Sequence, residues 1–103
     1  MVIRVVDFLP SADTAEQGAV LHNMLLDELK SGTTITVSFY HIQSATSSFV
    51  NAAFVDLLSH FGFDELKKRL RIVESSRQIN EMIKSRLSFE SDRVSRDVSR
   101  LHA

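Results

Sequence analysis

Hydroxyl side chains gather in one short stretch of this sequence. Ser44, Thr46, Ser47 and Ser48 lie between the strand-like segment "TITVSFYHI" and a very apolar segment that looks helical. A hydroxyl at the start of a helix can cap it by accepting a free backbone N–H, which is worth about 1 kcal/mol relative to alanine. One cap explains one or two of the four hydroxyls, so the remainder need another explanation.

Docking or modification is the second explanation for these hydroxyls. The carboxyl ends of parallel strands are where partners and ligands usually meet an α/β fold. A helix N-terminus there carries partial positive charge and free N–H donors, so it would stabilise a phosphate on Ser47 or, as second choice, on Ser48. We therefore expect a partner-docking surface, made of these hydroxyl residues with His41 before them and Phe49 after them.

No catalytic or metal-binding pattern accompanies the hydroxyls. The histidines, His22, His41, His60 and His102, have no partner at a metal-ligand spacing. A serine nucleophile would need a base, an orienting acid and an oxyanion hole, and no Gly-x-Ser-x-Gly motif is present. The sequence also has no cysteine. We expect no enzyme activity, no cofactor and no metal.

Composition excludes further classes of function. The 103 residues include 12 basic and 13 acidic ones, so no overall field attracts nucleic acid or an anionic membrane. No run approaches the roughly 18 apolar residues needed to span a bilayer. "MVIRVVDFLPS" is too short and too interrupted by charge for a signal peptide. We therefore expect a cytoplasmic protein without membrane contact.

The one basic cluster is "ELKKRLR", with Lys67, Lys68 and Arg69 at its centre. Its simplest interpretation is a solvated edge leading into a strand. The alternative is a contact with an acidic protein partner. Nucleic acid is a weak candidate because the cluster lacks interleaved aromatic residues and has acidic neighbours.

Apolar spacing and capping signals predict alternating strands and helices. Thr14 with Gln17, or Asp13 with Glu16, has the spacing of a capping box, and Gly32 follows the end of that helix. Ala52 and Ala53 are small enough to allow a second helix close packing on a sheet. The predicted strands cover residues 2–9, 34–42 and 70–73, and the predicted helices cover residues 14–30, 47–61 and a segment that Ser75 and Gln78 open with another capping-box spacing.

This order predicts a small single-domain βαβαβα protein of the α/β class, with a mostly parallel sheet and helices packed on it. The domain covers residues 1–88, and residues 89–103 form a marginal amphipathic helical extension. Val94, Val98 and Leu101 make a thin apolar stripe on that extension. Such a helix is a candidate arm for a homodimer or for a partner.

A family resemblance appears over roughly residues 2–88. "SGTTITVSFYHIQSATSSFVNAAFVDLLSHFG" followed by "LKKRLRIVESSRQINEMI" resembles the STAS-like domains, which are related to the sulfate transporter and anti-sigma factor antagonist fold. The resemblance implies a bacterial regulatory module that works by partner switching. The implied partner is a protein, such as an ATPase of the histidine-kinase-like class.

In the anti-sigma factor antagonists, the equivalent turn carries a phosphorylated serine within Asp-Ser-Ser-Gly. Here Thr46 takes the aspartate place, Ser47 the phosphorylated place and Phe49 the glycine place, so two of the four positions depart from the motif. Docking is therefore better supported than phosphorylation. A small adaptor or inhibitor, for example phage-borne, that uses the fold as a rigid surface remains an alternative, as does a small phosphate-ligand binder or enzyme.

Overall fold

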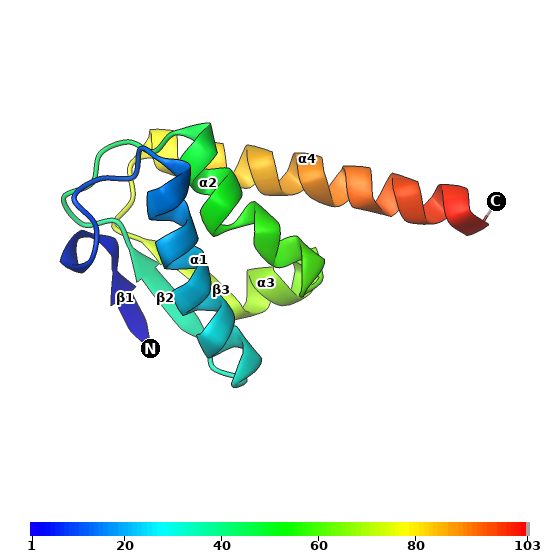
Figure 1. Ribbon diagram of the computed structural model, residues 1–103, viewed down its shortest axis with the longest axis horizontal. Coiled ribbons are helices and arrows are strands. Elements are labelled where there is room, and N and C mark those ends of the chain that lie inside the picture. The colour runs from blue at the N-terminus through cyan, green and yellow to red at the C-terminus, as the bar shows by residue number, and fades with distance from the viewer. Residues whose placement is uncertain (103) are drawn as a thin grey trace.

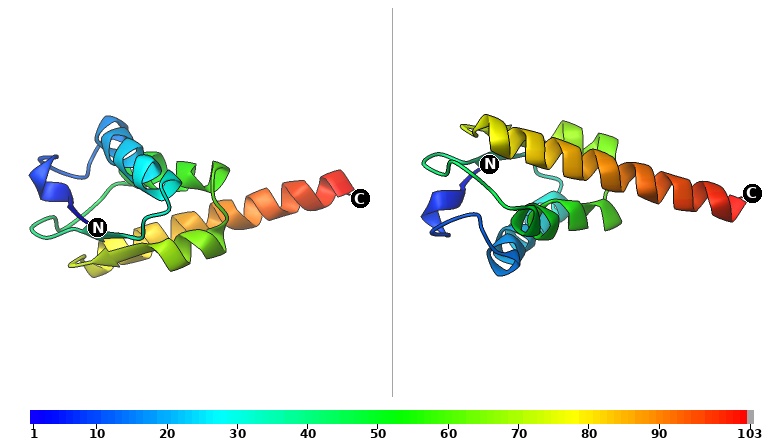
Figure 2. Two further views of the ribbon diagram at one scale, coloured as in Figure 1. Left: turned by 90° about the horizontal axis from the view of Figure 1, so that it is seen from below. Right: turned by 90° about the horizontal axis from the view of Figure 1, so that it is seen from above.

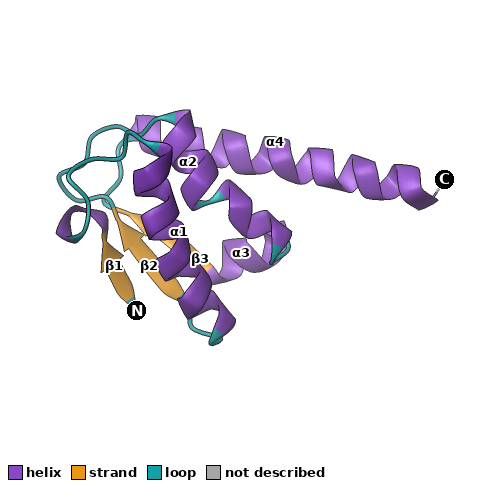
Figure 3. Cartoon of the chain, viewed as in Figure 1, coloured by secondary structure: helices purple, strands orange, loops and turns teal. Residues whose placement is uncertain are grey.

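Three parallel strands form one sheet in the computed structural model, which describes the backbone of residues 1–102 and the side chains of residues 1–92. Ile3 pairs with Val37, and Val37 pairs with Ile72, so all three side chains point to one face. The predicted α/β class with a parallel sheet is confirmed. The strands, in spatial order, are β1 (Val2–Arg4), β2 (Ile35–Ser38) and β3 (Leu70–Val73) (Figure 3).

The first strand is shorter than predicted. β1 ends at Arg4, opposite the last residue of β2, so further strand residues would have no partner. The chain turns instead into a short 3₁₀ helix, η1 (Val5–Asp7), and the N–H of Leu9 donates to the Val5 carbonyl at 3.0 Å. Both of these side chains are buried, so the turn keeps the segment over the core.

The first helix, α1 (Ala15–Lys30), has the predicted ends. Thr14 Oγ1 accepts the Gln17 N–H at 3.1 Å, and Gln17 Oε1 accepts the Thr14 N–H at 3.1 Å, so this pair forms the capping box. At the other end Gly32 has a φ of 89°, and its N–H donates to the Leu29 carbonyl. Glycine adopts this left-handed conformation without steric cost, which stops the helix.

Close contact between α1 and α2 (Ser47–Ala53) forms the centre of the helical layer. A Cβ atom on Gly18 would lie 2.5 Å from the Phe49 carbonyl oxygen and 2.8 Å from the Ala52 Cβ atom. The two helices can approach this closely only because Gly18 has no side chain. The prediction that Ala52 allows close packing on the sheet is wrong, because its side chain meets Gly18 of α1, and the same prediction for the buried Ala53 stays a prediction.

The predicted helix over residues 47–61 is interrupted. α2 ends at Ala53, and a 3₁₀ helix, η2 (Val55–Ser59), follows after Phe54. Phe54, at the junction, and Leu57, in η2, are both fully buried, so the segment still packs on the core after the change of pitch.

The C-terminal half begins with α3 (Phe63–Arg69), which leads directly into β3 over the predicted residues. The last helix, α4 (Arg77–His102), starts after Ser76, whose Oγ accepts the Ile79 N–H at 3.2 Å. The prediction that Ser75 and Gln78 form a capping box is therefore wrong.

α4 runs as one helix past the body of the fold (Figure 1). It packs against α2 and η2, and Arg86 Nε donates to Asn51 Oδ1 at 2.9 Å. α2 lies between α1 and α4 in both views of Figure 2. The predicted division between residues 1–88 and 89–103 falls inside α4 and stays a prediction.

The predicted dimerisation stripe lies outside the residues whose side chains are described, because Val94, Val98 and Leu101 follow residue 92. A homodimer through this segment therefore stays a prediction. None of the described helices is both long enough and apolar enough to cross a membrane.

Candidate functional site

Four of the predicted docking residues lie in a segment that we name the serine turn, residues 43–48, which comprises the loop before α2 and the first two residues of that helix. The side chains of Ser44, Ser47 and Ser48 are exposed to solvent. Thr46 is different, because its Oγ1 accepts the Phe49 N–H at 3.2 Å and donates to the Asp13 carbonyl at 2.7 Å. Thr46 is therefore the cap of α2, and the three serine side chains remain available at the surface.

The backbone of the serine turn is fixed from two directions. Gln78, on the first turn of α4, accepts the Ala45 N–H through Oε1 at 2.9 Å and donates through Nε2 to the Ala45 carbonyl at 2.9 Å. Ser76 Oγ donates to the Gln43 carbonyl at 2.7 Å. From the other side, the Thr46 N–H donates to the Ala12 carbonyl at 3.0 Å. These bonds hold the turn in one shape before any partner arrives.

Phe49 does not belong to the docking surface. Its side chain has no solvent exposure, because it packs in the core beneath the turn. The expectation that Phe49 contacts a partner is therefore corrected. Of the predicted docking residues, His41 and the three serines have exposed side chains that are free of the capping role.

The ends of β2 and β3 adopt an unusual backbone conformation. His41 has a φ of 64° and Glu74 a φ of 52°, a left-handed conformation that costs a non-glycine residue about 1 kcal/mol. Glu74 Oε1 accepts the hydroxyl of Ser38 at 3.0 Å, and Ser38 is buried. That bond gives Glu74 a structural role, whereas the His41 side chain makes no hydrogen bond within residues 1–92.

Aromatic and cationic side chains surround His41. The rings of Tyr40 and His41 lie 4.0 Å apart between centroids, and the Arg4 guanidinium stands 5.2 Å from the centre of the Tyr40 ring. All three side chains are exposed. The carboxyl edge of the sheet therefore presents aromatic rings and a cation close to the serine turn in the sequence.

The N-terminus of α2 would stabilise a phosphate on Ser47 less than the sequence predicts. α2 has 7 residues, whereas the predicted helix ran to residue 61. Fewer aligned peptide dipoles give a smaller partial charge at the helix end. A phosphate on Ser47 would therefore act mainly by its own charge and size.

The residues of the basic cluster have different environments. Arg69 donates from Nη1 to Glu65 at 3.0 Å and from Nη2 to the carbonyls of Leu29 and Thr33, so it closes the end of α1. The expectation that Arg69 contacts an acidic partner is therefore corrected. Lys67 and Lys68 are exposed.

Sequence reasoning missed the residues that fix the turn. Gln78 was assigned to a helix cap, and its bonds to Ala45 join segments 33 positions apart. No local pattern reports such a contact. The left-handed backbone of His41 was also missed, since histidine carries no turn signal of the kind that glycine or asparagine carries.

Metal chemistry finds no support in the described residues. His22 and His60 lie with their ring centroids 6.4 Å apart. Within residues 1–92, no group of three or more histidine, aspartate or glutamate side chains converges as metal ligands would.

The parallel sheet and the helical layer define a small domain of the α/β class, with the serine turn exposed at its surface. Residues 17–80 match the family described as a STAS-like domain of unknown function (DUF4325). The chain therefore belongs to this STAS-like family, and the resemblance found in the sequence is confirmed. Membership supports a regulatory or binding module. No curated protein and no solved structure shows significant similarity to the chain.

Proposed function

We propose that this protein is a non-enzymatic regulatory module that binds a protein partner through the serine turn. The observation that carries the proposal is the contrast within the turn: its backbone is held by Gln78 and Ala12, while Ser44, Ser47 and Ser48 remain exposed. A surface fixed in advance loses little conformational freedom on binding. His41 precedes the serine turn in the sequence, and its side chain is exposed.

The proposed mechanism is partner switching. One partner, of the histidine-kinase-like ATPase class, occupies the serine turn and thereby excludes another. Phosphorylation of Ser47 would add a charge of about −1.5 to −2 at the centre of the contact and release the partner. No other titratable side chain belongs to residues 43–48, so the added charge would dominate the local field.

The test uses two substitutions of Ser47 in tagged full-length protein expressed in its native host. Ser47→Trp adds bulk, and we expect it to remove the partner that co-purifies with wild type, identified by mass spectrometry. Ser47→Asp adds charge, and the switch predicts that it weakens the same complex by about tenfold. Ser88→Trp, an exposed serine on α4, is the matched control and should retain the partner.

The outcomes separate the alternatives. If Ser47→Trp loses the co-purifying partner and Ser47→Asp keeps it, the protein is an adaptor or inhibitor rather than a switch. The observation that supports this alternative is the hydrogen-bonded backbone of the turn. Retention of the partner by both variants would show that docking occurs elsewhere and would refute the proposal.

A further inference from the structure

β3 is an outer strand of the described sheet. The Phe39 N–H donates to the Val73 carbonyl at 3.1 Å, so Val73 and, two residues earlier, Arg71 direct their backbone groups toward β2. Because alternate residues of a parallel strand bond to opposite sides, Ile72 directs its N–H and carbonyl to the outer edge. This edge is a template on which another strand can pair.

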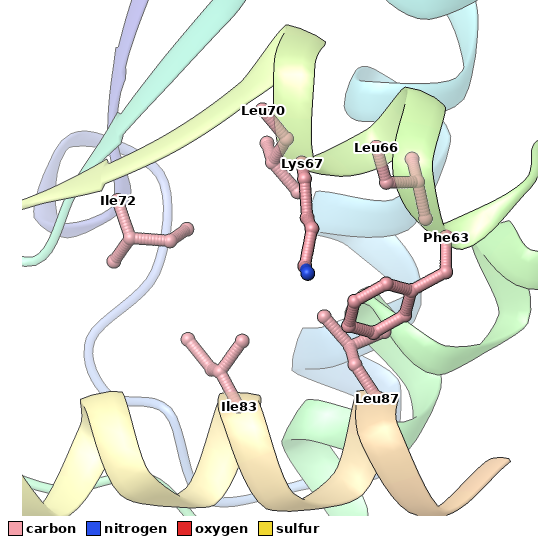
Figure 4. A pocket seen from close by; sticks show the side chains of 7 residues that line it. All are labelled: Phe63, Leu66, Lys67, Leu70, Ile72, Ile83 and Leu87. Carbon is pink, nitrogen blue, oxygen red and sulfur yellow. The ribbon is translucent and has the colours of Figure 1, made fainter. Parts of the chain in front are cut away.

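An apolar groove lies along this edge. It has a volume of about 110 Å³ and separates β3 and α3 from α4. In Figure 4, Ile72 and Ile83 face one another across it, and the amine of Lys67 points into the groove beside the Phe63 ring. The lining side chains are those of Phe63, Leu66, Lys67, Leu70, Ile72, Ile83 and Leu87.

Cations lie near the edge of β3 on both faces of the sheet. Lys67 is the one charged residue of the lining, and its Nζ stands 4.8 Å from the centre of the Phe63 ring. Arg71 alternates with Ile72, so it is exposed on the opposite face. Among the carboxylates of residues 63–74, Glu65 is paired with Arg69 and Glu74 accepts the Ser38 hydroxyl. The exposed cations Lys67, Lys68 and Arg71 outnumber the remaining acidic residues Asp64 and Glu74. Charge therefore favours an acidic occupant.

We propose that the outer edge of β3 is a docking site for an extended segment of a partner protein in which apolar and acidic residues alternate. Its backbone would pair with Ile72. Its apolar side chains would enter the groove, and its acidic side chains would lie beside Arg71, with one carboxylate reaching Lys67. The site is separate from the serine turn and does not depend on the function proposed for that turn.

A second copy of this chain is a poorer occupant. Pairing two β3 strands would bring together two copies of the same cationic segment, which contains Lys67, Lys68 and Arg71. Like charges on adjacent strands are destabilising. An acidic segment meets no such penalty.

The test is an NMR titration of the full-length ¹⁵N-labelled protein with a short synthetic peptide that alternates glutamate with valine. We expect the amide signals of Leu70–Val73 to shift, and exchange of the Ile72 amide with solvent to slow. A peptide that alternates lysine with valine should leave these signals unchanged. No shift with the glutamate peptide, or equal shifts with both peptides, would overturn the proposal.

Matched pairs of variants test which cations contact the acidic peptide. Lys67→Gln should weaken glutamate-peptide binding about threefold, whereas Lys68→Gln, at an exposed lysine outside the groove lining, should not change it. Arg71→Glu should weaken it about fivefold, whereas Arg4→Glu, on the opposite edge strand, should not. Equal effects within either pair, or an Ile72 amide already protected by self-association at high protein concentration, would contradict the proposed site.

Discussion

The serine turn and the outer edge of β3 are two surfaces with opposite chemistry. In the turn, the backbone groups of Ala45 and Thr46 are bonded within the protein, and the hydroxyl side chains of the three serines face solvent. At the edge, the backbone of Ile72 faces outward beside apolar side chains. The turn therefore offers a partner its serine side chains, which modification can change. The edge can recognise main chain, which tolerates varied sequences.

Gly18→Val should have the largest effect, because it separates the helices that support the turn. The added side chain would meet the Phe49 carbonyl and Ala52, and we expect the free energy of unfolding to fall by about 3 kcal/mol in urea titration. Gly62→Ala is the control, since a Cβ there meets no atom within 4 Å. Comparable losses in both variants would contradict the close helix contact.

Arg69→Ala tests the division of the basic cluster into structural and exposed cations. Loss of the bonds to Glu65, Leu29 and Thr33 should lower the free energy of unfolding by about 2 kcal/mol. Lys68→Ala should change it by less than about 0.5 kcal/mol. Equal urea midpoints for these two variants would show that Arg69 does not hold the end of α1.

Gln78→Ala removes the hydrogen bonds that join α4 to the serine turn, and it leaves the edge of β3 intact. The variant loses two hydrogen bonds to Ala45, so we expect the free energy of unfolding to fall by about 1–2 kcal/mol. Gln43→Ala, at an exposed glutamine within the turn, is the matched control. If the two variants have equal free energies of unfolding in thermal and urea titrations, the Gln78–Ala45 hydrogen bonds contribute nothing to stability.

His41→Gly should have the smallest effect and the opposite sign. Glycine adopts the left-handed conformation of position 41 without strain, so the free energy of unfolding should rise by about 0.5–1 kcal/mol. Glu74→Gly relieves the same strain but loses the bond to buried Ser38, so it should not stabilise. A stable His41→Gly variant that no longer binds the partner would support a functional role for the imidazole.

The sequence predicted the features that local patterns encode. The strand at 70–73 and the capping box of Thr14 follow from adjacent residues, and both are observed. The length of β1 was misjudged because it depends on where β2 ends. The break at Phe54 could not be predicted, because no glycine or proline marks it in the sequence.

The candidate site also has features that the sequence predicts and features that depend on the fold. Exposure of the three serines agrees with their polarity and position. The burial of Phe49 depends on the packing of α2, and the capping role of Arg69 depends on where α1 ends relative to α3. The groove could not be predicted, because it lies between segments that are adjacent only in the fold.

Amide hydrogen exchange of the isolated protein, measured residue by residue, tests both surfaces at once. The account predicts slow exchange at Ala45 and Thr46, whose N–H groups donate within the fold, and exchange at Ile72 at least about tenfold faster. Fast exchange at Ala45 and Thr46 would contradict the central claim, because it would mean that the serine turn is not held in place before a partner binds.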